Sequence, residues 1–135
     1  MSMISKIHIH KLPVTTEFRR QKRLIQNRGE LALIEDGLSF QHLGYFSLLA
    51  GKGYRGGHYH KQKTEHFYVI SGHLQVDLID VETGEQDQVE IKTGMKAIIY
   101  PNLAHRFTAL EDAQVIEYYD GVFDAEDDIL VEFSS

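Results

Sequence analysis

The chain has 135 residues, of which 42% are hydrophobic and 25% charged, and its formal net charge is −6 at pH 7. This length and composition predict a single globular domain over residues 1–135, large enough to bury a core. The negative net charge argues against a general nucleic-acid or anionic-membrane surface, so we expect neither partner. The sequence contains no cysteine, which excludes disulfides and thiolate metal ligands.

The sequence shows no targeting or membrane-spanning signal. Residues 1–10 carry no apolar run of signal-peptide length. No stretch approaches the roughly 18 apolar residues that a membrane-spanning helix needs. We therefore expect a cytoplasmic protein.

The N-terminal third of the chain mixes a strand pattern with a segment of ambiguous type. Residues 7–10 alternate apolar side chains with histidines, which is typical of an edge strand. Residues 16–26 predict either a short helix or an extended arm. A strand over 31–35 follows the turn at 27–29.

The remainder of the chain predicts short strands in close succession. Turn residues separate the strands at intervals of about ten residues, which is typical of an all-β sandwich or barrel. We expect the barrel core to span about 40–120, flanked by an N-terminal arm and by an acidic C-terminal tail at 124–128 that begins outside the barrel. The predicted strands cover residues 43–50, 67–70, 74–79, 88–91, 97–100, 105–109 and 114–119.

The segment 58–65 predicts a metal site. His58 and His60 are two residues apart, so on a strand both imidazoles project from one face. Glu65 follows five residues later and should face inward together with Phe67. Two neutral imidazoles and a carboxylate form a common first shell for a divalent transition metal with open coordination positions.

A third imidazole is available downstream at His105, which should face inward together with Phe107. A lone histidine is usually a satisfied core residue or a surface residue, and this alternative applies to each of the three histidines. Because two histidines share a face and a glutamate opens the next strand, we favour one bound divalent ion. Zn, Mn, Fe and Ni all suit such ligands.

The spacing of these residues resembles the two motifs of the cupin superfamily. The first motif, Gly-x5-His-x-His-x(3–4)-Glu-x6-Gly, is matched except at its leading glycine, where Lys52 stands. The second motif is weaker, because only its first glycine and its histidine are matched. The resemblance implies a double-stranded β-helix, or jelly-roll barrel, with one mononuclear metal. The matching residues are His58, His60, Glu65, Gly72, Gly94 and His105.

Two Arg-Gly segments, at 27–31 and 55–61, look like segments of cupins that modify sugar nucleotides. Those relatives include keto-sugar isomerases and epimerases and the cupin domain of capsule-precursor reductases. In the isomerases and epimerases a histidine of the second segment acts as a base, a place that His58 or His60 matches. A metal-bound imidazole is not free to act in that way. Arg28 and Arg55 would bind a substrate phosphate, since Arg forms bidentate bonds to phosphate oxygens; the alternative is a solvated surface.

The favoured function is enzymatic chemistry on a small polar keto or hydroxy compound, with a nucleotide-linked keto sugar as substrate. The metal would polarise a carbonyl, and Tyr45 and Tyr100 are candidate inward-facing proton donors; the sequence names no base. One alternative is an Fe or Mn dioxygenase or decarboxylase that uses the same ligands. Another is a cupin that binds a small ligand without turnover.

An exposed edge strand also bears on assembly. A small barrel leaves edges that need pairing or covering, and the strand that carries His8 and His10 is a candidate contact. Two-fold dimers are the commonest closed oligomers. We therefore expect a homodimer.

Overall fold

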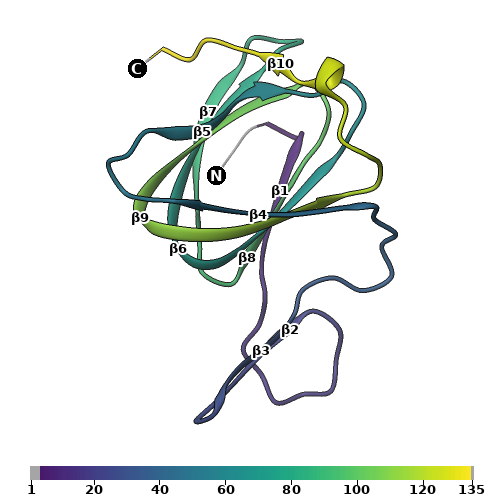
Figure 1. The fold of residues 1–135 in the computed structure, drawn as a ribbon, viewed down its shortest axis with the longest axis vertical. Helices are drawn as coiled ribbons and strands as arrows, with labels where there is room; N and C mark the ends of the chain where they lie inside the picture. Colours follow the sequence, from purple (N-terminus) through teal and green to yellow (C-terminus); the bar gives the residue numbers. More distant parts are fainter. Residues whose placement is uncertain (1–3, 135) are drawn as a thin grey trace.

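The computed structural model describes residues 4–134, and the regular secondary structure of this part is almost entirely β-strand (Figure 1). The all-β prediction is confirmed. Within this part of the chain the helical structure consists of one short 3-10 helix, η1 (Ala125–Asp127). The strands are β1 (Ile7–Lys11), β2 (Lys22–Gln26), β3 (Gly29–Leu33), β4 (His42–Leu48), β5 (Tyr54–Tyr59), β6 (Glu65–Asp80), β7 (Gln86–Lys92), β8 (Met95–Ile99), β9 (Leu103–Tyr119) and β10 (Ile129–Leu130).

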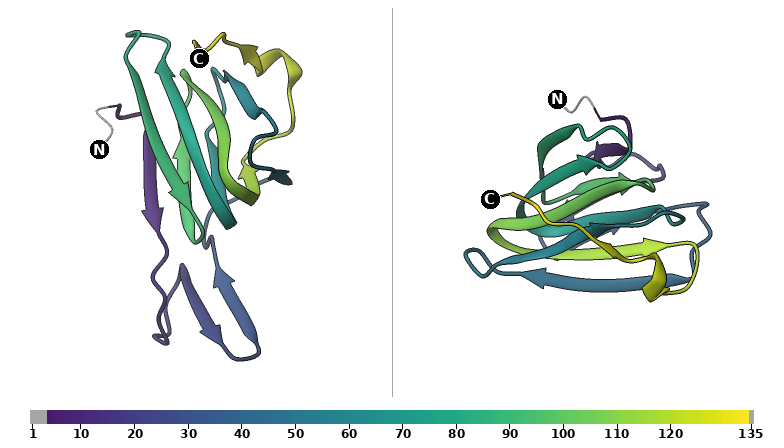
Figure 2. Two further views of the ribbon diagram at one scale, coloured as in Figure 1. Left: turned by 90° about the vertical axis from the view of Figure 1, so that its left-hand side faces the viewer. Right: turned by 90° about the horizontal axis from the view of Figure 1, so that it is seen from above.

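Two long antiparallel strands, β6 and β9, form the spine of the barrel. They pair from Asp80↔Leu103 to His66↔Tyr118. The first part of β6 also pairs with β8 and its second part with β7. In the same way, β9 pairs first with β5 and then with β4. Each long strand therefore contributes to both layers of the barrel, and Figure 2 shows the curvature that this requires.

The core lies between the two layers and follows from the alternation of the strands. Phe67 and Val69 are buried from one half of β6, and Leu74 and Val76 from the other half. Val115 of β9 packs in the same cluster. Successive side chains of a strand point to opposite faces, so the inward face that begins at Glu65 continues into the apolar core.

The bend in β6 depends on Gly72. The pairing of β6 with β9 shifts register on both sides of this residue, and its φ is +105°. A Cβ at this position would lie 2.4 Å from the carbonyl oxygen of Asp112 and 2.5 Å from Cα of Ala113. The glycine therefore lets the two long strands approach closely at the corner of the barrel.

We expect the substitution Gly72→Ala to lower the free energy of unfolding by about 3 kcal/mol, because it adds a backbone clash to an unfavourable positive φ. Gly84→Ala is the matched control. Gly84 also has a positive φ, +79°, but a Cβ there would have no neighbour within 4 Å. Urea denaturation should show a loss for Gly84→Ala that is smaller by at least about 1 kcal/mol; equal losses in the two variants would contradict the role of the close approach.

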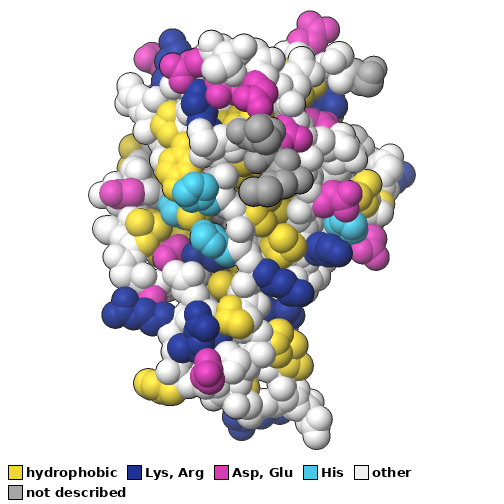
Figure 3. All heavy atoms as spheres, turned by 180° about the vertical axis from the view of Figure 1, so that it is seen from behind, with side chains coloured by type: hydrophobic (Ala, Val, Ile, Leu, Met, Phe, Trp, Pro, Cys, Tyr) yellow, Lys and Arg dark blue, Asp and Glu magenta, His cyan; other side chains and the backbone are white. Residues whose placement is uncertain are grey.

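The segment 16–26, predicted as a helix or an arm, instead contributes a strand to a hairpin. β2 and β3 pair with each other from Lys22↔Leu33 to Gln26↔Gly29 and form a separate two-stranded sheet. The hairpin projects from one end of the barrel (Figure 1). Figure 3 shows Lys and Arg side chains gathered where the hairpin meets the barrel, so a local basic surface exists despite the net negative charge.

A buried ion pair fastens the base of the hairpin to the barrel. Glu35 follows β3, and its Oε1 lies 2.7 Å from Nζ of Lys96, which is 2% exposed on β8. The hydroxyl of Tyr118 donates to the same oxygen at 2.8 Å. Burial raises the pKa of Glu35, but Lys96 and Tyr118 outweigh that effect, so the pKa falls below its ordinary value. Glu35 is therefore ionised at neutral pH.

The barrel extends beyond the predicted core of residues 40–120 at both ends. β1 pairs with β8, and β10 pairs with β5. The acidic segment at 124–128 begins with exposed residues, as expected, but its Asp127 is buried and accepts from the backbone N–H groups of Lys61 and Gln62 in the loop after β5. The predicted domain of residues 1–135 includes residues 1–3 and 135, which lie outside the described residues. No helix in the described part is long and apolar enough to cross a membrane.

Candidate functional site

The four residues predicted as metal ligands lie together inside the barrel. One donor atom from each of His58, His60, Glu65 and His105 falls within 4.8 Å of the other three. His58 is on β5 and pairs in register with His105 of β9, whereas Glu65 is the first residue of β6. His60, Glu65 and His105 are buried and His58 is partly exposed, so the cluster has one open side.

Two glycines bring His58 into the cluster. Gly56 and Gly57 both have positive φ, and the pairing of β5 with β9 shifts register between Gly56 and His58. A Cβ on Gly56 would lie 2.7 Å from the carbonyl oxygen of His105. Such a bulge re-aims the following side chain, and here it turns His58 toward His105.

The outer nitrogens of the three imidazoles are each held by a fixed oxygen. The Nδ1–H of His60 donates to the carbonyl oxygen of Asp127 at 2.5 Å, and that of His105 donates to the carbonyl of Leu103 at 3.0 Å. Nδ1 of His58 lies 2.8 Å from Oδ1 of Asp128. Because a carbonyl oxygen only accepts, the neutral forms of His60 and His105 leave Nε2 without a proton. Outer partners of this kind typically orient metal-bound histidines.

The inner atoms of the cluster have no proton donor. Nε2 of His60 and Nε2 of His105 lie 3.0 and 3.1 Å from Oε1 of Glu65. All three atoms are buried without a hydrogen-bond partner. Electron-rich atoms at these distances repel one another unless a cation lies between them or the imidazoles take up protons. The donor set of three imidazoles and one carboxylate therefore fits a divalent transition metal.

The groups of the cluster shift one another's pKa values. Burial raises the pKa of Glu65, but the His105 and His60 imidazoles outweigh burial and hold it far below its usual range. Burial, reinforced by the neighbouring His105, lowers the pKa of His58 to about 4. Burial also lowers the pKa of His60, but Glu65 outweighs it, so the net shift is upward. At neutral pH Glu65 is an anion and His58 a neutral donor.

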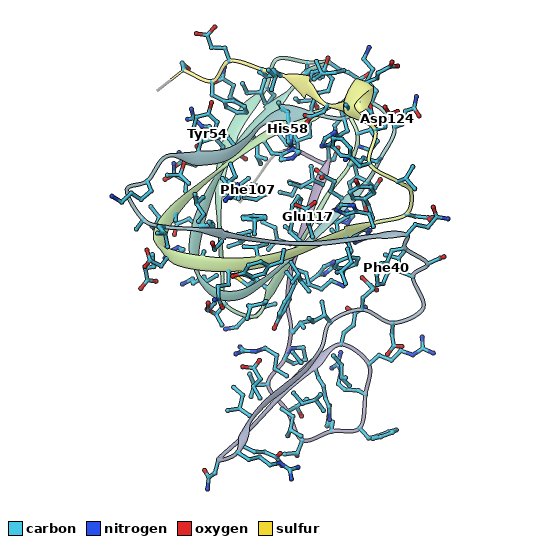
Figure 4. All side chains as sticks on the ribbon, in the orientation of Figure 1. Phe40, Tyr54, His58, Phe107, Glu117 and Asp124 are labelled. Carbon is cyan, nitrogen blue, oxygen red and sulfur yellow. The ribbon has the colours of Figure 1, made fainter. Side chains whose placement is uncertain are left out.

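The cluster forms one wall of a cavity of about 240 Å³. Phe46 and Phe107 supply apolar walls, and the open side is partly charged. In Figure 4 the labelled His58, Phe107 and Glu117 lie within the outline of the barrel, away from the hairpin. The other lining residues that carry chemistry are His42, Arg55, Lys63, Glu117, Tyr119 and Asp128. A larger hollow of about 680 Å³ between β1 and β7 contains His8 and His10, but it contains no donor cluster within the described residues.

Of the two predicted phosphate-binding arginines, the structure places only Arg55 at the cavity. Its Nε donates to the carbonyl of Ser47 at 2.9 Å, and its guanidinium lies 5.7 Å from the centre of the Phe46 ring. Arg28 is exposed in the turn of the hairpin, where its Nε donates to Oε1 of Gln26 at 3.1 Å. The expectation that Arg28 lines the pocket of its own chain is not met, because 22–33 folds as a projecting hairpin.

The two predicted tyrosines also lie outside the cavity. Tyr45 is 57% exposed, because its neighbour Phe46 occupies the inward position of β4 and successive side chains alternate. The hydroxyl of Tyr100 lies 3.3 Å from Nδ1 of His8 on β1. Neither side chain can donate a proton inside the pocket of this chain, so this expectation was wrong. The tyrosine that does line the cavity is Tyr119.

Sequence reasoning missed the residues that approach the cavity from distant parts of the chain. His42 comes from the start of β4, Glu117 and Tyr119 from the end of β9, and Asp128 from the C-terminal segment. A short motif carries no signal for such long-range partners. The one available signal is strand alternation. Glu117 lies an even number of residues after the inward-facing Phe107, so both side chains should point to the same face of the strand.

Residues 26–128 match the family described as the polysaccharide biosynthesis C-terminal domain. This match covers more than half of the chain. The chain belongs to this family. No curated protein matches it. The donor cluster, the oxygens that hold its outer nitrogens and the residues that line the cavity all lie within the region matched by this family.

Solved structures that resemble this family member are cupins that act on sugar nucleotides. A mutant 3,4-ketoisomerase from Thermoanaerobacterium thermosaccharolyticum in complex with TDP-4-keto-6-deoxyglucose has a TM-score of 0.76 and 16% identity, covering 94% of this chain and 88% of that one. A TDP-quinovose 3,4-ketoisomerase from Campylobacter jejuni has a TM-score of 0.75 and 18% identity, covering 93% of each chain. These likenesses confirm the predicted cupin jelly roll.

A third similar structure extends the range of reactions. The dTDP-4-dehydrorhamnose 3,5-epimerase from Sulfolobus tokodaii has a TM-score of 0.75 and 19% identity, covering 95% of this chain and 78% of that one. At these identities the shared property is the fold. One barrel thus supports both isomerases and epimerases, so the reaction must be argued from the site.

Proposed function

We propose that this chain is a metal-dependent isomerase or epimerase that acts on a nucleotide-linked keto sugar. The observation that carries the proposal is the cluster of His58, His60, Glu65 and His105 beside a cavity, in which Nε2 of His60 and Nε2 of His105 lie 3.0 and 3.1 Å from one carboxylate oxygen of Glu65. Membership of a polysaccharide biosynthesis family and the sugar-nucleotide reactions of similar folds support the choice of substrate class.

The same four residues would hold one divalent ion, and Zn, Mn, Fe and Ni all suit the donor set. When bound, such an ion supplies a Lewis acid that polarises a substrate carbonyl and so acidifies the adjacent C–H bond. The Nδ1 partners of the three histidines keep the donor atoms aimed inward. Because donor positions are fixed before substrate arrives, little reorganisation is needed on binding.

The remaining walls of the cavity would position the substrate. Its volume of about 240 Å³ is below the roughly 300–1,000 Å³ of sites that enclose a whole drug-sized ligand. A sugar ring would therefore lie inside while the nucleotide lies at the mouth. Arg55 at the rim supplies a cationic group for a phosphate, and Phe46 and Phe107 exclude water from one side.

The test is deuterium exchange. Metal-loaded protein is incubated in D₂O with TDP-4-keto-6-deoxyglucose and, separately, with its UDP-linked analogue. Exchange at a carbon next to the ketone, followed by mass spectrometry and NMR, is the expected result. Oxygen consumption without exchange would favour the dioxygenase alternative, and tight binding without exchange would favour a non-catalytic binding protein.

We expect Arg55→Ala to raise KM for the nucleotide sugar by about tenfold or more, because a charge-assisted hydrogen bond to phosphate contributes roughly 1.5–3 kcal/mol. The matched control is Arg28→Ala, which removes an arginine of the other Arg-Gly segment that lies away from the cavity and should leave KM unchanged. Steady-state kinetics of the two variants make the comparison. An equal rise for both would indicate that the hairpin of one subunit reaches a site on another.

A homodimer and a cytoplasmic location remain proposals. β1 pairs with β8 along one edge, and an isologous contact through its other edge would cover exposed backbone groups. Light scattering at micromolar concentration should give twice the chain mass of 15.5 kDa. A monomeric mass would contradict the dimer.

A further inference from the structure

A second histidine–carboxylate pair lies in the same cavity as the donor cluster and takes no part in it. Nε2 of His42 lies 3.0 Å from Oε2 of Glu117. Both side chains line the cavity, and both are about a quarter exposed. His42 comes from the first position of β4 and Glu117 from β9, so neither belongs to the segment that carries the metal-binding motif.

The imidazole of His42 is held in one orientation. It stacks on the ring of Tyr119 with a centroid separation of 4.2 Å and an interplanar angle of 9°. Tyr119 pairs with His42 in the β4–β9 register, so the stack is built into the sheet. Because the carboxylate of Glu117 only accepts, Nε2 of His42 carries the proton, which leaves Nδ1 of the neutral ring as a proton acceptor.

The neighbouring position on β4 keeps space open for the pair. Gly44 has no unusual φ, so its backbone does not require glycine. A Cβ at this position, however, would lie 3.1 Å from Cγ of Glu117 and 3.2 Å from Nε2 of His42. The inward face of β4 thus consists of His42, Gly44 and Phe46. Any larger residue at position 44 would crowd the side chains of His42 and Glu117.

Other charged groups of the cavity surround this pair without competing for it. Nζ of Lys63 lies 4.1 Å from the centre of the Tyr119 ring and 4.0 Å from Oε2 of Glu65. The hydroxyl of Tyr119 is buried without a hydrogen-bond partner. The cavity therefore combines a donor cluster on one wall, a histidine–glutamate pair on another and a lysine between them.

We infer that His42 is the proton-transfer residue of this pocket and that Glu117 is its positioning residue. The inference rests on the proposed function and supplies the base that the donor cluster cannot, since ligated imidazoles have no free lone pair. In the step, Nδ1 of His42 takes the proton from the carbon next to the keto group. The C–H electron pair becomes the new C=C bond, and the carbonyl π pair moves to oxygen. Return of the proton to carbon restores a ketone, so no oxidant or reductant is consumed.

The experiment compares His42→Gln, Glu117→Gln and Gly44→Ala with the wild-type protein, all metal-loaded, in the deuterium-exchange assay with TDP- and UDP-4-keto-6-deoxyglucose. Loss of a general base should slow exchange by about 10²–10⁴-fold while leaving metal content at the wild-type value. Glu117→Gln should lower kcat by at least about tenfold, but by no more than His42→Gln does. KM should be unchanged, because the substitution alters only the orientation and tautomer of the His42 ring. Gly44→Ala should also lower kcat with KM unchanged.

His73→Gln is the matched control. His73 forms a similar pair with Glu90, with Nε2 and Oε1 2.6 Å apart, but that pair joins β6 to β7 outside the cavity. This variant should exchange at the wild-type rate. Melting temperature and elemental analysis of every variant separate loss of the base from loss of the fold or metal.

The outcomes separate the two proposals. Exchange by the wild-type protein together with near-wild-type exchange by His42→Gln overturns the assignment of His42 and leaves the proposed function standing. No exchange by the wild-type protein with either sugar overturns the proposed function and, with it, the role of His42. Exchange lost in His42→Gln and kept in His73→Gln, with equal metal content, supports both.

Discussion

Replacing His105 with alanine is expected to abolish stoichiometric binding of a divalent metal ion. His105 is 1% exposed, and its Nε2 is one of the buried atoms that have no partner in the cluster. Removing it leaves two imidazoles and a carboxylate on an open wall, and the ion loses both a donor and its enclosure. Elemental analysis of purified protein should fall from about one ion per chain to a trace.

The same loss should be visible in stability. A ligand that binds only the folded state at a free concentration of 100 times its Kd adds about 2.7 kcal/mol to the free energy of unfolding. Zinc should therefore raise the melting temperature of the wild-type apoprotein but not that of His105→Ala. Glu65→Gln, which keeps the side-chain volume, is a second variant that should show the same loss. His10→Ala on β1 is the control. Retention of one ion per chain by His105→Ala would contradict the assignment of His105 as a ligand.

Replacing Glu35 with glutamine is expected to lower the free energy of unfolding by about 3–5 kcal/mol, since it leaves the ammonium group of Lys96 buried without a counter-charge. Lys96 is 2% exposed, so water cannot replace the lost partner. Urea denaturation at pH 7 measures the effect. This loss of stability should become smaller when the pH falls below 4.5, the ordinary pKa of Glu. Because the pKa of folded Glu35 is lower than that value, its stabilising contribution is complete above pH 4.5 and is lost progressively as acid protonates the carboxyl.

The double variant Glu35→Gln/Lys96→Met tests the cause. Removing both charges leaves no uncompensated ion, so the double variant should be more stable than Glu35→Gln alone. Additive losses would show that the two side chains do not act as a pair. Because Glu35 lies between β3 and the barrel, Glu35→Gln should also make the hairpin more mobile. Faster amide hydrogen exchange over residues 22–33 would show this.

The sequence was sufficient to predict the strand class and the gathering of His58, His60, Glu65 and His105 in one place, because both depend on short-range patterns. Period-two alternation places Glu65 and Phe67 on the inward face, and both are buried. The pattern failed where one strand continues through a turn-like sequence. The dipeptide Ser71-Gly72 predicts the end of a strand, yet β6 runs from Glu65 to Asp80. The positive φ of Gly72 allows the strand to bend there without ending.

The second half of the site could not be predicted, because nothing local marks it. His42 lies 75 residues before its partner Glu117, and Nδ1 of His60 is held by a backbone carbonyl 67 residues away. A backbone acceptor has no residue-type signature at all. Side-chain chemistry alone does not place Tyr45 or Tyr100 in the cavity, because alternation on β4 directs Phe46 inward and leaves the adjacent Tyr45 exposed.

Asp127 and Asp128 hold the outer nitrogens of His60 and His58, so an ion bound by the donor cluster would be thermodynamically linked to the docking of the C-terminal segment. Besides these histidine contacts, Asp127 accepts from the backbone N–H groups of Lys61 and Gln62, β10 pairs with β5 over two residues, and the N–H of Val131 donates to the carbonyl of Gly57. If release of the segment weakens an ion's binding by some factor, the ion must oppose release by the same factor. A short, weakly paired end of the chain would then act as a thermodynamic reporter of an ion that it does not itself touch.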